Sequence, residues 1–114
     1  MYRTAYKETE CSGQISLIII ADDYSPFPAG RSYADGPFSA ERFRREFLVP
    51  ALLDGCLEVN LDRTGGFASN WLQEAFGGLV TKECFSPTIL DYKLFISSYE
   101  DDSLIEEIWS YIRA

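Results

Sequence analysis

Apolar residues alternate with polar ones in the middle of the chain and then change to a helical spacing. Leu57, Val59 and Leu61 lie at every second position, which predicts a strand. After a glycine-bearing turn, Ser69 or Asn70 stands where a helix N-cap is expected, and good helix formers follow. A strand that leads through a turn into a helix is a common location for a site in α/β proteins, because the helix N-terminus offers free N–H groups.

The predicted helix over 70–81 has two faces when its residues are placed at about 100° per position. Its core face holds Trp71, Leu72, Ala75, Phe76, Leu79 and Val80. Its other face holds Asn70, Gln73, Glu74, Gly77 and Thr81, with Gly78 at the margin. Two adjacent glycines inside a helix cost on the order of 1 kcal/mol each relative to alanine, so a close neighbour is expected there. That neighbour is either a protein partner or another part of this chain, such as the loop 22–38.

An earlier helical pattern begins after Ser39, its predicted N-cap, and ends at Gly55. Its core face is predicted to hold Phe43, Phe47 and Ala51, and its solvent face Arg42, Arg44, Arg45 and Glu46. Pro50 lies inside the pattern, where it lacks an N–H group and crowds the carbonyl of Glu46. The helix is therefore expected to kink or break near Val49.

The last third of the chain alternates between helical and extended patterns. Ser86-Pro87 is typical of an N-cap and first residue of a short helical turn, and the segment 93–97 predicts a strand. Ser103 and Glu106 have the spacing of a capping box at the start of a final helix. The core face of this helix is predicted to hold Leu104, Ile105, Ile108, Trp109 and Ile112.

The first third predicts a hairpin over 3–21, with Gly13 at its turn. Its β-branched run from Leu17 to Ile20 is typical of a central strand. The loop 22–38 is rich in Pro, Gly and aromatic residues, and within it Arg31 and Asp35 either fasten the loop or contact a ligand or partner. The whole pattern indicates a single α/β domain with a core over 39–113.

Composition narrows the function classes. The chain has 114 residues, 46% of them hydrophobic, which is enough for one domain with a real core. A formal net charge of −8 argues against direct binding to nucleic acid or to an anionic membrane. This charge indicates either ordinary solubility or an acidic inhibitor that occupies a basic nucleic-acid-binding site on a partner. The polar N-terminus and the lack of a long apolar run predict a cytoplasmic protein.

The side chains offer little for catalysis. Histidine is absent, which removes the commonest general base and zinc ligand. Cys11, Cys56 and Cys84 lack CxxC spacing and are expected to be small apolar fillers in a reducing compartment, so no metal or other cofactor is predicted. Asp62, at the end of a predicted strand, is the best single acid for a small hydrolase, but no nucleophile–base pair accompanies it. We therefore expect a protein that is not an enzyme.

A set of short motifs is shared with a known family. The motifs are Asp35-Gly36-Pro37-Phe38-Ser39, Phe43-Arg44, Leu48, Pro50-Ala51-Leu52, Asn60-Leu61-Asp62, Ser69, Trp71-Leu72, Glu74-Ala75-Phe76-Gly77-Gly78-Leu79-Val80 and Ser103-Leu104-Ile105-Glu106-Glu107-Ile108-Trp109. In these motifs the chain resembles the STAS-like domains of unknown function found in bacterial and phage proteins. The resemblance covers about 20–112, and the EAFGGLV helix is its most specific part.

The resemblance implies a mixed sheet of about four or five strands, including the hairpin, with helices packed on it. It also implies a non-enzymatic regulatory module that binds a protein partner, such as a histidine-kinase-like ATPase or an anti-sigma-type kinase. In the related antagonists of anti-sigma factors, a kinase phosphorylates a hydroxyl residue at the helix start, which corresponds here to Ser69 or Asn70. Asn70 cannot accept a phosphate, whereas Ser69 either accepts one or serves as a plain N-cap. The expected partner-binding or regulatory residues are Asp62, Ser69, Asn70, Glu74, Gly77 and Gly78.

Overall fold

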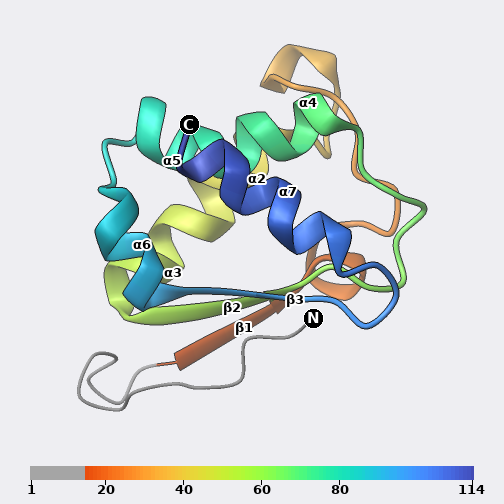
Figure 1. Cartoon of the computed structure of the whole chain (residues 1–114). Helices are drawn as coiled ribbons and strands as arrows, with labels where there is room; N and C mark the ends of the chain where they lie inside the picture. The colour runs from red at the N-terminus through yellow and green to blue at the C-terminus, as the bar shows by residue number, and fades with distance from the viewer. Residues whose placement is uncertain (1–14) are drawn as a thin grey trace.

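A computed structural model of the protein describes residues 15–114 and shows a three-stranded sheet with helices stacked on one of its faces (Figure 1). The first strand of the predicted hairpin over 3–21, its turn at Gly13, and Cys11 lie outside the described residues. Helical segments separate β1 from β2 and β2 from β3, which agrees with the alternation of strand and helix signals in the sequence.

The sheet of the described residues is parallel throughout, with the order β1-β2-β3. Its strands are β1 (Ile15–Ile19), β2 (Cys56–Asn60) and β3 (Leu94–Ser97). The described residues thus contain three strands, and the predicted four or five strands, their mixed directions and the hairpin are not confirmed. The middle position in this part of the sheet belongs to β2, whereas the sequence favoured the segment that forms β1.

Helical segments connect the strands and cover the sheet. After β1 come a π-helical turn η1 (Ile20–Tyr24) and a 3₁₀ turn η2 (Tyr33–Asp35) within the long loop. A first long helix consists of α2 (Ala40–Phe43), η3 (Arg44–Leu48) and α3 (Val49–Asp54). A second consists of α4 (Ser69–Leu72), η4 (Gln73–Gly77) and α5 (Gly78–Thr81). The shorter α6 (Pro87–Lys93) precedes β3, and α7 (Ser103–Ile112) closes the described chain.

Two of the predicted helix starts are confirmed. The Ser39 hydroxyl accepts a hydrogen bond from the Arg42 N–H at 3.2 Å, and the Ser86 hydroxyl accepts from the N–H groups of Thr88 and Ile89. Each serine thereby satisfies N–H groups that the first helical turn leaves without carbonyl partners. Ser103 does not form the predicted capping box: α7 has no side-chain cap at its start, and the Ser103 hydroxyl bonds Asp101 instead.

Of the two outcomes predicted at Pro50, a kink or a break near Val49, the break does not occur. The turn before the proline, η3, is π-helical, and the Val49 N–H bonds the Arg44 carbonyl five residues back. A π-helical turn holds one more residue than an α-helical turn, so it accommodates the missing donor and the bulk of the proline ring. The helix therefore continues to Asp54 and ends at Gly55 as predicted.

The core lies between the sheet and the two long helices. From the sheet, Leu57, Val59, Leu94 and Ile96 are fully buried, and each fully buried side chain of this size contributes roughly 1.5–3 kcal/mol. The helices contribute Phe43, Leu48, Leu52, Trp71, Leu72, Phe76, Leu79, Ile105, Ile108 and Ile112. The loop 22–38 packs against the helices: the Tyr24 ring lies 5.0 Å from those of Phe43 and Phe47, and the Trp71 indole N–H bonds the Phe38 carbonyl.

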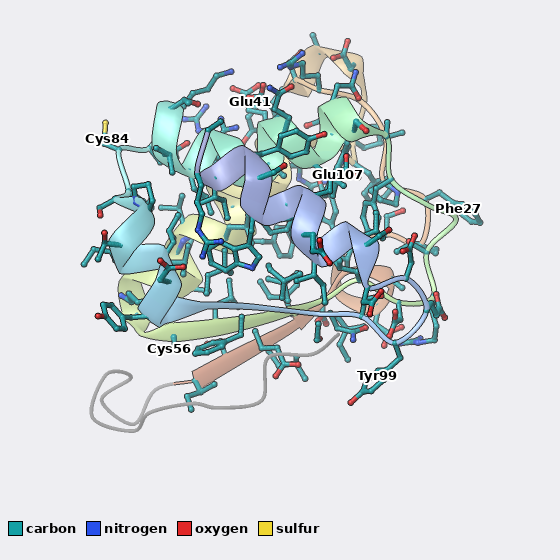
Figure 2. All side chains as sticks on the ribbon, in the orientation of Figure 1. Phe27, Glu41, Cys56, Cys84, Tyr99 and Glu107 are labelled. Carbon is teal, nitrogen blue, oxygen red and sulfur yellow. The ribbon has the colours of Figure 1, made fainter. Side chains whose placement is uncertain are left out.

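The cysteines do not all follow the expectation of buried fillers. Cys56 is fully buried beside Phe95, but it is disulfide-bonded, so the expectation of a free thiol in a reducing compartment is wrong for this residue. Cys84 is a free cysteine, but it is exposed and lies in the turn before α6 with its sulfur pointing outward (Figure 2). None of the helices formed by residues 15–114 is both long and apolar enough to cross a membrane.

Candidate functional site

The second long helix carries the residues that the sequence singled out, and its predicted core face is confirmed. Trp71, Leu72, Ala75, Phe76 and Leu79 are almost fully buried. The opposite face is only partly covered, because Glu74, Gly77 and Gly78 are buried whereas Asn70, Gln73 and Thr81 are exposed. Other segments of the same chain cover this part of the helix.

The glycine pair allows two of these segments to approach closely. A Cβ atom at Gly77 would lie 3.3 Å from the Tyr111 Cβ of α7. A Cβ atom at Gly78 would lie only 2.5 Å from the Arg44 Nη1. The close neighbour is therefore intramolecular, and it consists of α7 and the first long helix rather than the loop 22–38.

Glu74 forms the centre of a charged cluster, which we define as Glu74, Glu83, Arg31, Arg44 and Lys82. Arg44 Nη1 donates to the Glu74 Oε2 at 2.8 Å and to the Glu74 backbone carbonyl, and Arg44 Nε donates to the Glu83 Oε2 at 2.8 Å. Lys82 Nζ lies 2.7 Å from the same Glu74 Oε2, and Arg31 Nε lies 3.0 Å from Oε1. Arg44 and Glu74 are 2% and 5% exposed, so this is a buried ion pair, and the prediction that Arg44 faces solvent is wrong.

The cluster holds Glu74 in its charged form. Burial alone would raise the pKa of the Glu74 carboxyl, but hydrogen bonds from Lys82, Arg44 and Arg31 outweigh it and lower this pKa to about 2. Burial also acts against the charge on Arg44, yet its bonds to Glu83 and Glu74 raise the pKa of the guanidinium. Both groups thus stay ionised at neutral pH.

A pocket of about 330 Å³ opens beside this cluster, between the second long helix and α7. Gly77 and Gly78 are among its lining residues, and Tyr111 and Arg44 take up the space into which their side chains would extend. Its walls are formed by Arg31, Gln73, Glu74, Thr81, Lys82, Tyr111 and Ala114. The pocket thus combines backbone, hydroxyl and amide groups with two cationic side chains, Arg31 and Lys82, which are each about half exposed.

The start of the second long helix lies near one wall of this pocket. Ser69 is exposed and is not an N-cap, since the cap position is Ala68 and no side chain bonds the first N–H groups. Its hydroxyl contacts the Tyr111 hydroxyl, which in turn donates to the Glu107 Oε2 at 2.7 Å. The bond to Glu107 raises the pKa of Tyr111. Asn70 is also exposed at this end of the helix.

Asp62 lies apart from the pocket and anchors the loop between β3 and α7. Its carboxylate accepts hydrogen bonds from the Ser98 hydroxyl at 2.8 Å and from the backbone N–H groups of Tyr99 and Glu100. Burial would raise the pKa of Asp62, but these bonds, together with one from Asn60, lower it. A carboxylate stabilised in this way is a poor proton acceptor, and its geometry is that of a structural anchor.

Arg31 and Asp35 do not pair with each other. Asp35 accepts hydrogen bonds from the backbone N–H groups of Arg31 and Ser32, which fastens the loop and lowers the pKa of this carboxyl. The Arg31 side chain extends instead to Glu74. Asp35 thus has the fastening role that the sequence offered as one alternative, and Arg31 belongs to the pocket.

Comparison with protein families gives a match over residues 39–102 to the STAS-like domain of unknown function (DUF4325). The chain belongs to this family. No curated protein and no solved structure gave a match. In the STAS-like domain, the matched residues include both long helices, β2 and β3, whereas Arg31 and α7, which complete the pocket, lie outside the matched range.

The STAS-like domain brings some of the sequence-predicted residues together and separates others. Glu74, Gly77 and Gly78 meet at the pocket, Ser69 and Asn70 lie at the adjoining helix start, and Asp62 is at the end of β2. Sequence reasoning missed Arg44, Lys82, Glu83 and Tyr111. A signal for Arg44 existed, since the glycines required a close neighbour, but the sequence did not indicate which residue it was. Within residues 15–114, the His, Cys, Asp and Glu side chains form no group that could hold a metal ion.

Proposed function

We propose that this STAS-like domain is a non-enzymatic regulatory module that binds a protein partner through the pocket between its second long helix and α7. The observation that carries the proposal is the pocket itself, which lies over Gly77 and Gly78 and is bounded by polar side chains from three separate segments. A pocket with a few convergent polar groups is the default binding-site hypothesis for a domain of this kind. The exposed Ser69 and Asn70 extend the proposed surface to the helix start.

A catalytic role has less support from the described residues. The carboxylate of Asp62, the best acid candidate, accepts hydrogen bonds from the loop between β3 and α7 and lies apart from the pocket. Glu74 is held ionised by three cations and makes a poor general acid at neutral pH. The family resemblance favours a kinase-like ATPase or an anti-sigma-type kinase as the partner, and this choice is an analogy rather than a reading of the geometry.

The glycines themselves are unsuitable for testing this surface, because a side chain at Gly78 would collide with Arg44 and a bulky one at Gly77 would press against Tyr111 of the same domain. Gln73 is exposed at the pocket wall, so Gln73→Trp narrows the pocket without disturbing a buried contact. The matched control is Glu106→Trp, which adds the same bulk at an exposed position of α7 outside the pocket lining. The free energies of unfolding of both variants should lie within about 0.5 kcal/mol of the wild-type value.

The measurement is quantitative co-purification of the tagged domain from its host, followed by a binding isotherm with the purified partner. We expect the wild type and Glu106→Trp to bind equally and Gln73→Trp to bind at least tenfold more weakly. Equal binding by all three proteins would remove the pocket from the interface. Nucleotide hydrolysis by the pure protein that is lost in Asp62→Asn would instead support an enzyme.

A further inference from the structure

The charged cluster beside the pocket has more cations than carboxylates. Glu74 and Glu83 carry two negative charges, whereas Arg31, Arg44 and Lys82 carry three positive charges. The chain as a whole has a net charge of −8, so this local excess of one positive charge runs against the general charge of the protein. An excess cation beside a pocket indicates a preference for an anionic group.

The three cations differ in how firmly they are held. Arg44 is buried and is fixed by Glu74, the Glu74 carbonyl and Glu83, so it stabilises both carboxylates from within the domain. Arg31 and Lys82 are half exposed, line the pocket, and each contacts the one carboxylate of Glu74. Arg31 uses only its Nε for this contact, and within residues 15–114 its two terminal nitrogens make no hydrogen bond. They remain available to an incoming acceptor without loss of the existing bonds.

The volume of the pocket and the charge of the chain limit what can enter. The volume of about 330 Å³ suits one side chain and a short piece of backbone rather than a folded surface. The overall charge of −8 opposes a polyanion such as a nucleic acid, so a single negative charge fits better than many.

We infer that the pocket receives the carboxylate of one acidic residue, carried by an extended segment of the partner protein, and that Arg31 and Lys82 bind it. This inference rests on the proposed function, since it names the chemistry of the partner at the same pocket. Bonds from a guanidinium and an ammonium to a carboxylate are charge-assisted and are stronger than neutral hydrogen bonds. Arg44 remains paired with Glu74 and Glu83 and balances their negative charge while the two exposed cations bind the partner.

The direct test is a titration of the full-length ¹⁵N-labelled domain with a capped pentapeptide of four alanines and a central glutamate, monitored by NMR. The matched peptide has glutamine at the centre and differs only in charge. We expect the glutamate peptide to shift the amide signals of Gly77 and Gly78 and to bind at least tenfold more tightly than the glutamine peptide. Equal affinities, or no shift of either signal at about 5 mM peptide, would overturn the inference, since even weak specific binding is detectable there.

Variants then test whether Arg31 and Lys82 are the side chains that bind the carboxylate. Lys82→Met and Arg31→Met should each lower the affinity for the glutamate peptide about tenfold and leave the affinity for the glutamine peptide unchanged. Arg63→Met is the matched control, because Arg63 is as exposed as Lys82 but pairs with Asp22. Arg63 and Asp22 both lie outside the pocket lining. If Gln73→Trp blocks the partner while Lys82→Met and Arg31→Met do not, the docking surface stands and the charge inference fails. If none of the three affects the partner, both fail.

Discussion

Glu74 is a residue whose surroundings contradict its position on the helical wheel. Its carboxylate is 5% exposed and accepts hydrogen bonds from three cationic side chains. Glu74→Gln removes that charge and leaves Arg44 buried with Glu83 as its remaining carboxylate. Because breaking one side of a buried ion pair typically costs 3–5 kcal/mol, we expect the free energy of unfolding at neutral pH to fall by about 3 kcal/mol. Urea denaturation followed by circular dichroism measures this change.

The loss of stability caused by Glu74→Gln should depend on pH. The pKa of Glu74 is about 2 in the folded protein and 4.5 ordinarily, so its contribution is complete above pH 4.5 and is lost as the pH falls towards 2. The gap in unfolding free energy between the wild type and Glu74→Gln should therefore shrink by about 3 kcal/mol between neutral pH and pH 2. Glu106→Gln, at an exposed position, should follow the wild type throughout. A gap that stays constant over this range would show that Glu74 does not titrate as the structure indicates.

At the scale of elements, the second long helix meets two neighbours through its glycine pair. An alanine at Gly78 places a methyl group 2.5 Å from the Arg44 Nη1, and Arg44 cannot move without losing bonds to Glu74 and Glu83. Alanine gains about 1 kcal/mol in helix propensity, but displacing the buried ion pair costs more. We expect Gly78→Ala to lower the unfolding free energy by about 2 kcal/mol in urea denaturation.

Gly77→Ala is the matched control on the same helix. Its methyl group would lie 3.3 Å from the Tyr111 Cβ, which α7 can accommodate by a shift of a few tenths of an ångström. The gain in helix propensity offsets that shift, so this variant should stay within about 1 kcal/mol of the wild type. Equal effects at the two glycines would argue against Arg44 as the reason for Gly78.

The loop between β3 and α7 depends on one carboxylate. Asp62→Asn keeps the size of the side chain but removes the charge that receives the Ser98 hydroxyl and two backbone N–H groups. Hydrogen bonds to charged groups contribute about 1.5–3 kcal/mol, so we expect a loss of about 2 kcal/mol, measured by thermal and urea unfolding. Ser98→Ala, which removes one donor and keeps the carboxylate, should cost less. Unchanged stability of Asp62→Asn would leave a functional role as the better explanation of this residue.

Local signals in the sequence predicted elements well, and contacts between elements were not predictable. Ser39 and Ser86 cap helices because a cap depends on a few neighbouring residues. The burial of Arg44 depends on Glu74, 30 residues away, and no periodicity within one helix contains that information. The break that was one alternative at Pro50 does not occur for a related reason: η3 widens locally, which a rule for an ideal α-helix does not include. The α/β class and the capped helix starts at Ser39 and Ser86 therefore followed from the sequence, whereas the charged cluster did not.

At the scale of the whole molecule, α7 and the family-matched region share the main buried cluster. Ile105, Ile108 and Ile112 belong to the same buried cluster as Leu57, Trp71 and Phe76, although α7 lies beyond residue 102. A chain of this size whose main buried cluster includes residues from the sheet, from both long helices and from α7 is expected to unfold in a single cooperative step. Unfolding followed by Trp71 or Trp109 fluorescence should then have the same midpoint as unfolding followed by circular dichroism.

Ile108→Ala tests whether α7 is part of that cooperative unit. Ile108 is fully buried, and truncating such a side chain costs 2–5 kcal/mol, so we expect a loss of about 3 kcal/mol with all midpoints shifted together. Ser110→Ala, at an exposed position of α7, should leave the midpoints almost unchanged. Separate transitions, with Trp109 fluorescence changing before circular dichroism, would instead show that α7 detaches first. In that case the wall of the pocket that carries Tyr111 would open independently of the core, and partner binding would be coupled to the docking of α7.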